Sequence, residues 1–162
     1  MSFSMSTSSI PVFEIGLSAL SGVLGKAAAY AAAKKIDPSV LLQSRLYPDM
    51  FPLVRQVQIA SDQAKNGISR LAGVEPPRHE DNETTIDQLK ERLARTLSYL
   101  ESIDPKKIDG SADHDITFPL GPTNKGHMKG ADYLNHFVLP NFYFHMSEIG
   151  RASCRERVCL AV

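Results

Sequence analysis

The sequence YPDMFPLVRQVQIASDQAKNGISRLAG, residues 47–73, decides the fold class. Its apolar and small side chains recur at alternating spacings of four and three residues, which is the period of one face of an α-helix. Gly73 follows the run, as glycine commonly does just beyond a helix end. The pattern predicts a long amphipathic helix whose buried stripe is formed by Met50, Val54, Val57, Ser61, Ala64, Ile68 and Leu71.

Three further segments on either side of this helix carry the same period. The first covers residues 11–35, and the next begins after a capping box formed by Thr85 and Gln88. The last begins near Ala131. Four long helices, joined by loops that allow neighbouring antiparallel packing, predict an all-α protein built as an antiparallel four-helix bundle.

The segment before the last predicted helix has a different pattern. Ile116 and Phe118 alternate with polar residues, and turn-forming residues follow between Gly121 and Gly126. These signals predict a small β-hairpin or an extended loop. Pro140 lies inside the last helix, where it removes a hydrogen bond and its ring strikes the carbonyl of residue 136, so we expect a kink there.

Both ends of the chain differ from the helical domain, which we place at residues 10–148. Residues 1–9 are rich in serine and are expected to form a flexible N-terminal tail. Residues 149–162 begin IGRASCRERV, which is the translation of one frame of a common sequencing adaptor, so we interpret them as an adaptor-derived tail. Cys154 and Cys159 both lie in this tail, and we therefore expect neither a disulfide nor a metal site from their spacing.

Composition and charge narrow the class of protein. The chain is 43% hydrophobic and 22% charged with a formal net charge of zero, as in an ordinary single globular domain. Because no helix face gathers lysine and arginine, we do not expect a nucleic-acid partner. Lys26, Lys34 and Lys35 interrupt the longest apolar run, and the amino terminus lacks the charged front of a secretory signal. We therefore expect a cytoplasmic protein without a membrane segment.

Three blocks of the sequence carry a family resemblance: LYPDMFPLVRQVQIASDQAK, TTIDQLKERLARTLSYLE and DYLNHFVLPNFYFH. Over residues 10–145 the chain resembles an uncharacterised bacterial family, domain of unknown function nineteen ninety-three, in the DinB/YfiT-like superfamily. The resemblance implies a DinB-like four-helix bundle that is often dimeric. In this family the last helix is expected to continue past FYFH through an aromatic and basic segment. Here MSEIGRASC takes its place, which supports a C-terminal truncation.

The resemblance also raises the question of a metal. The wider superfamily often holds a divalent metal on one histidine of helix two and two histidines of helix four, and some members are thiol-dependent transferases. This chain departs from the pattern, because its second long helix has no histidine. His136 and His145 lie nine residues apart on the last helix, about half a turn around an ideal helix, so they share a metal only if Pro140 turns the second half. His145 alone remains as a weak candidate ligand for zinc or nickel, and no cofactor is otherwise expected.

Two interpretations of His145 are open. With Asn141 one turn earlier and Gln58 or Asp62 across the seam, it would be the remains of a metal or proton-transfer site. Alternatively, His136 and His145 are partly buried histidines that hydrogen-bond among aromatic neighbours. We favour the second interpretation, because buried polar side chains normally find partners without being catalytic.

An aromatic run on the last helix includes Tyr143, which with its neighbours would line an apolar pocket or a dimer face, although such clusters are more often core. Our leading hypothesis is an uncharacterised DinB-like bundle that forms a cytoplasmic homodimer and has a pocket for a small ligand. The alternative is a divalent-metal-dependent enzyme that resembles the thiol transferases of the superfamily, with His145 as a ligand.

Overall fold

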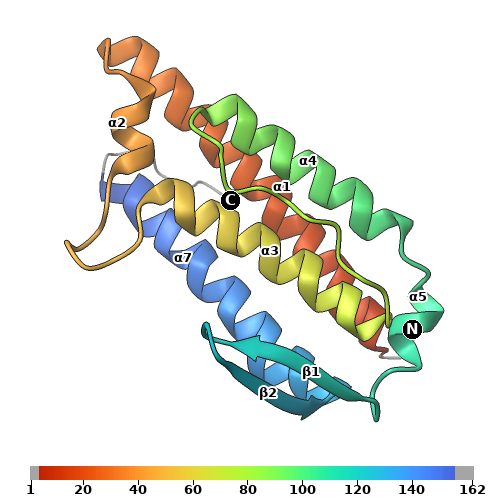
Figure 1. Cartoon of the computed structure of the whole chain (residues 1–162). Helices are drawn as coiled ribbons and strands as arrows, with labels where there is room; N and C mark the ends of the chain where they lie inside the picture. The colour runs from red at the N-terminus through yellow and green to blue at the C-terminus, as the bar shows by residue number, and fades with distance from the viewer. Residues whose placement is uncertain (1–3, 156–162) are drawn as a thin grey trace.

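The computed structural model describes the fold of residues 4–155 and the side chains of residues 4–149 (Figure 1). Helices make up most of the described chain, and its strands form one two-stranded antiparallel sheet. The predicted helical class with a hairpin before the last helix is therefore confirmed. The elements are α1 (Met5–Lys34), α2 (Pro38–Gln43), α3 (Leu53–Leu71), α4 (Ile86–Ser102), α5 (Pro105–Asp109), β1 (Asp115–Leu120), β2 (Asn124–Lys129), α6 (Gly130–Asp132), the π-helix η1 (Tyr133–Val138) and α7 (Leu139–Arg155).

Helix α1 begins at Met5, within the segment that we expected to be a tail. The Ser4 side chain accepts a hydrogen bond from the backbone N–H of Thr7, and the Thr7 hydroxyl accepts one from the backbone of Ser4. The backbone N–H of Ser6 also donates to Asp109 of α5 at 2.8 Å. Residues 4–9 are thus ordered by a capping box and a long-range contact, because serine and threonine are good helix caps as well as common tail residues. Residues 1–3 lie outside the described part.

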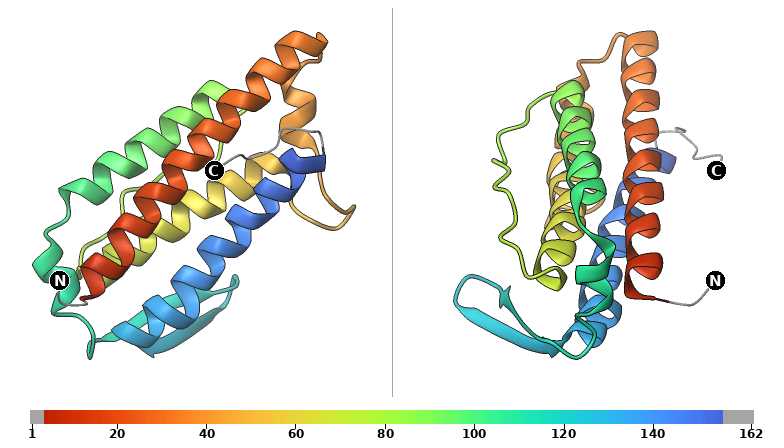
Figure 2. Two further views of the ribbon diagram at one scale, coloured as in Figure 1. Left: turned by 180° about the vertical axis from the view of Figure 1, so that it is seen from behind. Right: turned by 90° about the vertical axis from the view of Figure 1, so that its right-hand side faces the viewer.

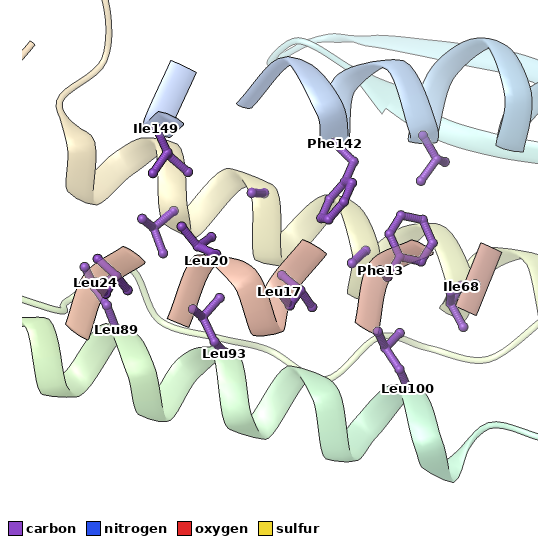
Figure 3. Packing of buried hydrophobic residues seen from close by; sticks show 14 of the residues in the cluster. Phe13, Leu17, Leu20, Leu24, Ile68, Leu89, Leu93, Leu100, Phe142 and Ile149 are labelled. Carbon is purple, nitrogen blue, oxygen red and sulfur yellow. The ribbon is translucent and has the colours of Figure 1, made fainter. Parts of the chain in front are cut away.

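Helix α1 is also long and apolar enough, by length and composition, to cross a membrane, and it is the one such helix in the described part of the chain. Only 33% of its most apolar window is buried. Its buried residues include Phe13, Leu17, Leu20 and Leu24, which pack in the core (Figure 3). Core helices of soluble proteins meet the same criterion, so this feature is weak evidence for a membrane segment.

Helices α3 and α4 run in the same direction, because the segment between them returns along the length of the helices (Figure 1, Figure 2). This corrects our expectation that neighbouring helices would all be antiparallel. Helix α3 has 19 residues and is about 28 Å long. The returning segment consists of residues 72–85. At about 3.3 Å per residue it can reach roughly 46 Å, which is enough to run back along the full length of α3. Helix α1 is antiparallel to α3 and α4, and α3 is antiparallel to α7 (Figure 1).

The last helical segment starts where the sequence predicted it, but it contains a π-helical turn. The backbone N–H of Leu139 donates to the carbonyl of Leu134, five residues earlier. This wider turn comes immediately before Pro140, where we expected a kink. A π turn holds one extra residue, which changes the direction in which the following side chains point. The faces of α7 therefore cannot be read from an ideal helix that starts at Ala131.

The core lies between α1, α3, α4 and α7, and Figure 3 shows part of it. The rings of Phe13 and Phe142 meet edge to face with centroids 5.0 Å apart. Ile149 is 1% exposed and belongs to this core, so α7 continues through the boundary at which we placed the tail. Cys154 lies within α7, whereas residues 156–162, with Cys159, lie outside the described residues.

A glycine lets the last helical segment approach α3 closely. A Cβ atom at Gly67 would lie 2.4 Å from Cγ1 of Val138, which no real Cβ contact allows. Both residues are buried, and the side chain of Val138 packs directly on the α3 backbone at Gly67. This close packing brings the polar residues of α3 and α7 within hydrogen-bonding distance farther along the same pair of helices.

Candidate functional site

His145 of α7 and Gln56 of α3 form a hydrogen bond inside the protein. The distance from Nδ1 of His145 to Oε1 of Gln56 is 2.6 Å, and both side chains are buried. Because an amide oxygen only accepts, Nδ1 carries the proton and Nε2 has the free lone pair. Burial, together with the positive charge of Arg55, lowers the pKa of His145 below its usual value. The imidazole is therefore neutral at pH 7, and the pair carries no charge.

The other predicted site residues of the last helix do not join this pair. Asn141 is one turn before His145, but its Nδ2 donates to the backbone carbonyl of Phe137 at 2.6 Å. His136 is exposed, with its Nε2 3.7 Å from a carboxylate oxygen of Asp132. Tyr143 is 53% exposed. The structure thus places these residues in three different environments, and only His145 contacts a polar residue of α3.

Gln58 and Asp62 do not lie across the seam from His145, which corrects our expectation. Nε2 of Gln58 donates to Glu83 at 2.9 Å, and a carboxylate oxygen of Asp62 accepts from Arg92 at 2.9 Å. The reason is helical geometry: at about 100° per residue, Gln58 points roughly opposite to Gln56. Both residues therefore face α4 and the returning segment rather than α7.

Arg92 of α4 is the centre of a second, charged group of residues. Its side chain is fully buried, with 0% of its surface exposed. Nη1 donates to Glu83 at 3.0 Å, Nη2 lies 2.9 Å from Asp62 and 3.1 Å from Asp81, and Nε donates to Ser61 at 3.0 Å. Every nitrogen of the guanidinium group has a partner. Since these partners come from α3 and from residues 72–85, Arg92 fixes the returning segment to both helices.

His79 lies beside this charged group. Its Nδ1 is buried and has no hydrogen-bond partner among the described residues. Burial lowers the pKa of His79 from 6.5 to about 4, and the positive charges of Lys65 and Arg92 act in the same direction, against the opposing effect of Asp62. A neutral histidine is therefore built into the returning segment, and its protonation would place a further positive charge beside two buried ones.

Replacing His79 by glutamine is expected to reduce the loss of stability between about pH 6.5 and pH 4. A histidine in the unfolded chain has a pKa near 6.5, whereas folded His79 has one of about 4. As the pH falls, the unfolded state binds the proton first, and the folded state loses stability. We expect roughly 1–2 kcal/mol from this group after allowing for solvent screening. Urea unfolding at pH 7 and pH 4.5 measures how much the free energy of unfolding falls in the wild type and in His79→Gln.

The control for this experiment is His136→Gln, because His136 is an exposed histidine of the same chain. It should lose stability with falling pH as the wild type does. If His79→Gln lost as much stability between pH 7 and pH 4.5 as the wild type does, the buried imidazole would not be the source of the acid sensitivity.

A family model described as Domain of unknown function (DUF1993) matches residues 5–149, which is most of the chain. The chain belongs to the DUF1993 family. The crystal structure of a DinB family member protein from Shewanella denitrificans resembles the DUF1993 chain with a TM-score of 0.85 and 36% sequence identity. The match covers 93% of this chain and 84% of that chain.

No curated protein matches the chain. The family match and the structural match agree with each other, and they place the protein in the DinB-like superfamily, as its sequence blocks predicted.

The residues of this DUF1993 protein do not fit the metal site that the superfamily resemblance implies. Helices α3 and α7 are its second and fourth long helices. His145 and Gln56 meet between them, and Asn141 lies one turn before His145 on α7. That set has one imidazole and two neutral amides, whereas zinc and nickel favour imidazole, thiolate and carboxylate ligands. Among the described residues, no group of three or more histidine, cysteine, aspartate or glutamate side chains is placed to hold a metal ion.

The central residue of the charged group, Arg92, and the partner of His145, Gln56, were not among the predicted site residues. Arg92 has a readable signal, because it lies three residues after Leu89 and next to Leu93 on the apolar face of α4. An arginine within an apolar stripe predicts a buried, paired guanidinium group. Gln56 has no comparable signal, because α3 is buried around most of its circumference and neighbouring glutamines are buried on opposite sides.

Proposed function

We propose that this protein is a cytoplasmic DinB-like four-helix bundle that forms a homodimer and binds a small molecule, without metal-dependent chemistry of its own. The observation that carries the proposal is the hydrogen bond between His145 and Gln56. The superfamily resemblance implies a metal between α3 and α7, whereas here two neutral, buried side chains from these helices form a hydrogen bond with each other. This arrangement stabilises the contact between α3 and α7 and supports binding rather than catalysis.

The nearby charged residues support the same proposal. General acid or base catalysis needs a titratable group that can reach a bound substrate. The carboxylates of Asp62, Asp81 and Glu83 are instead bound to Arg92. Their hydrogen bonds hold the returning segment in place, which is a structural role. The alternative of a thiol-transferase-like metal enzyme has no comparable support in the donor set.

Two aromatic side chains on α7 support the homodimer. Tyr143 and Phe144 are each 53% exposed, although both are large and carry mostly apolar surface. Tyrosine and phenylalanine are enriched where proteins contact each other, because they bury a large area at a small entropic cost. We propose that these residues lie in the interface between two copies of the chain.

Sedimentation equilibrium tests this interface. We expect the wild type to have about twice the chain mass of 17.8 kDa, and the double variant Tyr143→Ser, Phe144→Ser to have the mass of one chain. Leu120→Ser is the control, since Leu120 is also large, apolar and exposed but lies on the hairpin. A wild type that stays monomeric at roughly 100 µM, where a dimer with a micromolar Kd would be assembled, would contradict the homodimer.

A further inference from the structure

A surface groove lies between the end of α3, the first residues after it and the β-hairpin. Its volume is about 350 Å³, and its sides are formed by Val74 and Pro76 on one hand and Thr117 and Pro119 on the other. This size suits a ligand of one or two rings, because ligand sites typically begin at about 300 Å³. The groove lies apart from His145 and Gln56, because neither of them is among its lining residues.

One wall of the groove is fixed by a cluster of aromatic rings. Phe118 of β1 borders the groove but is only 2% exposed, with its centroid 4.3 Å from that of Phe137 and 4.8 Å from that of Tyr133. The Phe118 ring also packs over Gly126 of the paired strand, where a Cβ atom would lie 2.5 Å from it. The hairpin wall of the groove is therefore rigid, since the hairpin and the last helical segment hold Phe118 from both sides. An apolar ligand would meet the more accessible Pro76 and Pro119 rather than this buried ring.

Two cationic residues line the same groove, Arg70 and Lys125. Arg70 is half-buried, and its Nη1 donates to the hydroxyl of Tyr133 at 3.0 Å. That neutral hydroxyl orients the guanidinium group without neutralising its charge. The remaining N–H groups of the fork can therefore bind an oxyanion, which guanidinium recognises through paired hydrogen bonds.

The balance of charge in the groove favours an anion. Glu75 also lines it and contributes one negative charge, and the carboxyl end of α3 adds about half a negative charge. Arg70 and Lys125 together contribute two positive charges, so the sum stays positive. An anionic group would gain most beside Arg70 and Lys125, with the apolar body of the ligand against Val74, Pro76 and Pro119.

We propose that this groove binds a small aromatic carboxylate or sulfonate. This inference rests on the proposed ligand-binding function and assigns its place and chemical class. Pro76 and Pro119 contact the ring system, Arg70 binds the anionic group, and Lys125 closes the open side.

Fluorescence titration with anilinonaphthalene sulfonate tests the proposal, because this probe joins an aromatic body to a sulfonate group. We expect saturable binding to the folded wild type, about tenfold weaker binding after Lys125→Gln, and a similar loss after Arg70→Gln. Phenylnaphthylamine, which has the same rings without the charge, should bind at least about tenfold more weakly than the sulfonate. Lys90→Gln on the exposed face of α4 is the matched control and should bind as the wild type does.

The outcomes distinguish failure of the groove as the binding site from failure of the proposed ligand-binding function. Lys125→Gln is the decisive variant, because Lys125 is exposed on the hairpin and its replacement leaves the core unchanged. Cooperative thermal unfolding of each variant excludes probe bound to partly unfolded protein. Saturable binding that neither Lys125→Gln nor Arg70→Gln weakens would overturn the groove as the site while leaving ligand binding in place. No saturable binding to the wild type would overturn the groove and count against the ligand-binding function as well.

Discussion

Replacing Arg92 by alanine is expected to lower the free energy of unfolding by about 3–5 kcal/mol. The guanidinium group is fully buried and lies within 3.1 Å of carboxylate oxygens of Asp62, Asp81 and Glu83. Removing it leaves these negative charges next to one another, and the side chain of Glu83 is only 4% exposed. Breaking a buried ion pair from one side costs much more than the pair itself contributes, because the remaining charge is desolvated and unpaired.

The loss of stability in Arg92→Ala should be concentrated in the returning segment. Residues 72–85 are held to α3 and α4 by these bonds, and they include no helix or strand of their own. In Arg92→Ala, amide hydrogens and protease sites in this segment should become accessible before the helices unfold. Arg92→Lys should recover part of the stability, because lysine restores the charge but cannot reproduce the bonds of a planar fork.

Urea unfolding followed by circular dichroism measures the effect, with Arg95→Ala as the control. Arg95 is on the same helix, its side chain is 62% exposed, and its nearest recorded carboxylate oxygen, on Glu83, is 4.0 Å away. Exposed pairs of this kind contribute at most about 1 kcal/mol. If Arg92→Ala lost no more stability than Arg95→Ala, the buried ion-pair group would not hold the returning segment. Should Arg92→Ala fail to fold, Arg92→Lys and Asp62→Asn provide smaller changes for the same comparison.

The double substitution Gln56→His, Asn141→His is expected to create a site for nickel or zinc. Residues 141 and 145 are one turn apart on α7, a spacing at which two histidines can bind one metal ion. Residue 56 faces His145 from α3, since their side-chain atoms are 2.6 Å apart in the wild type. Three imidazoles from two facing helices supply the nitrogen ligands that both metals favour. We expect one metal ion per chain with roughly micromolar or tighter affinity, about −8 kcal/mol.

Isothermal titration calorimetry with nickel measures this gain. The matched control is Gln58→His, Asn141→His, which has the same number of histidines but places one on the opposite side of α3, toward Glu83. It should bind nickel no better than the wild type. Adding His145→Ala to the three-histidine variant should remove the new site. Equal gains in the two double variants would show that the pairing of residue 56 with His145 does not determine metal binding.

The ends of the helices were largely predictable, because capping is a local property of the sequence. The capping box of Thr85 and Gln88 begins α4 as expected, and alternation at Ile116 and Phe118 correctly marked β1. The early start of α1 was missed because serine-rich sequence suits both a flexible tail and a helix cap. In this chain the contact from Ser6 to Asp109, a residue more than a hundred positions away, supports the helical alternative.

The direction of α4 was not predictable from its own residues. The period of Leu89, Leu93 and Leu100 shows which face is buried, but a helix buries the same face whichever way it runs. The direction of α4 is set by the returning segment. The length of this segment permits either topology, and Glu83, the buried residue that anchors it, looks in the sequence like a solvated charge. Long-range ion pairs of this kind leave no periodic signal.

The candidate site was predicted in part. His145 was correctly singled out, but its partner is Gln56 rather than Gln58 or Asp62. A difference of two residues on a helix moves a side chain about 200° around the axis, so a small uncertainty in orientation exchanges one partner for another. The π-helical turn before Pro140 adds to this uncertainty on α7, since it shifts every later face by one residue.

Nuclear magnetic resonance of the His145 ring nitrogens at pH 7, before and after adding one equivalent of zinc, tests directly whether His145 is a neutral structural residue. We expect a neutral ring with the proton on Nδ1, as its hydrogen bond to Gln56 requires, and no change in either nitrogen when zinc is added. A protonated ring, or a shift of Nε2 on adding zinc that disappears in His145→Ala, would contradict this expectation. The second result would show that the position between α3 and α7 is a metal site after all.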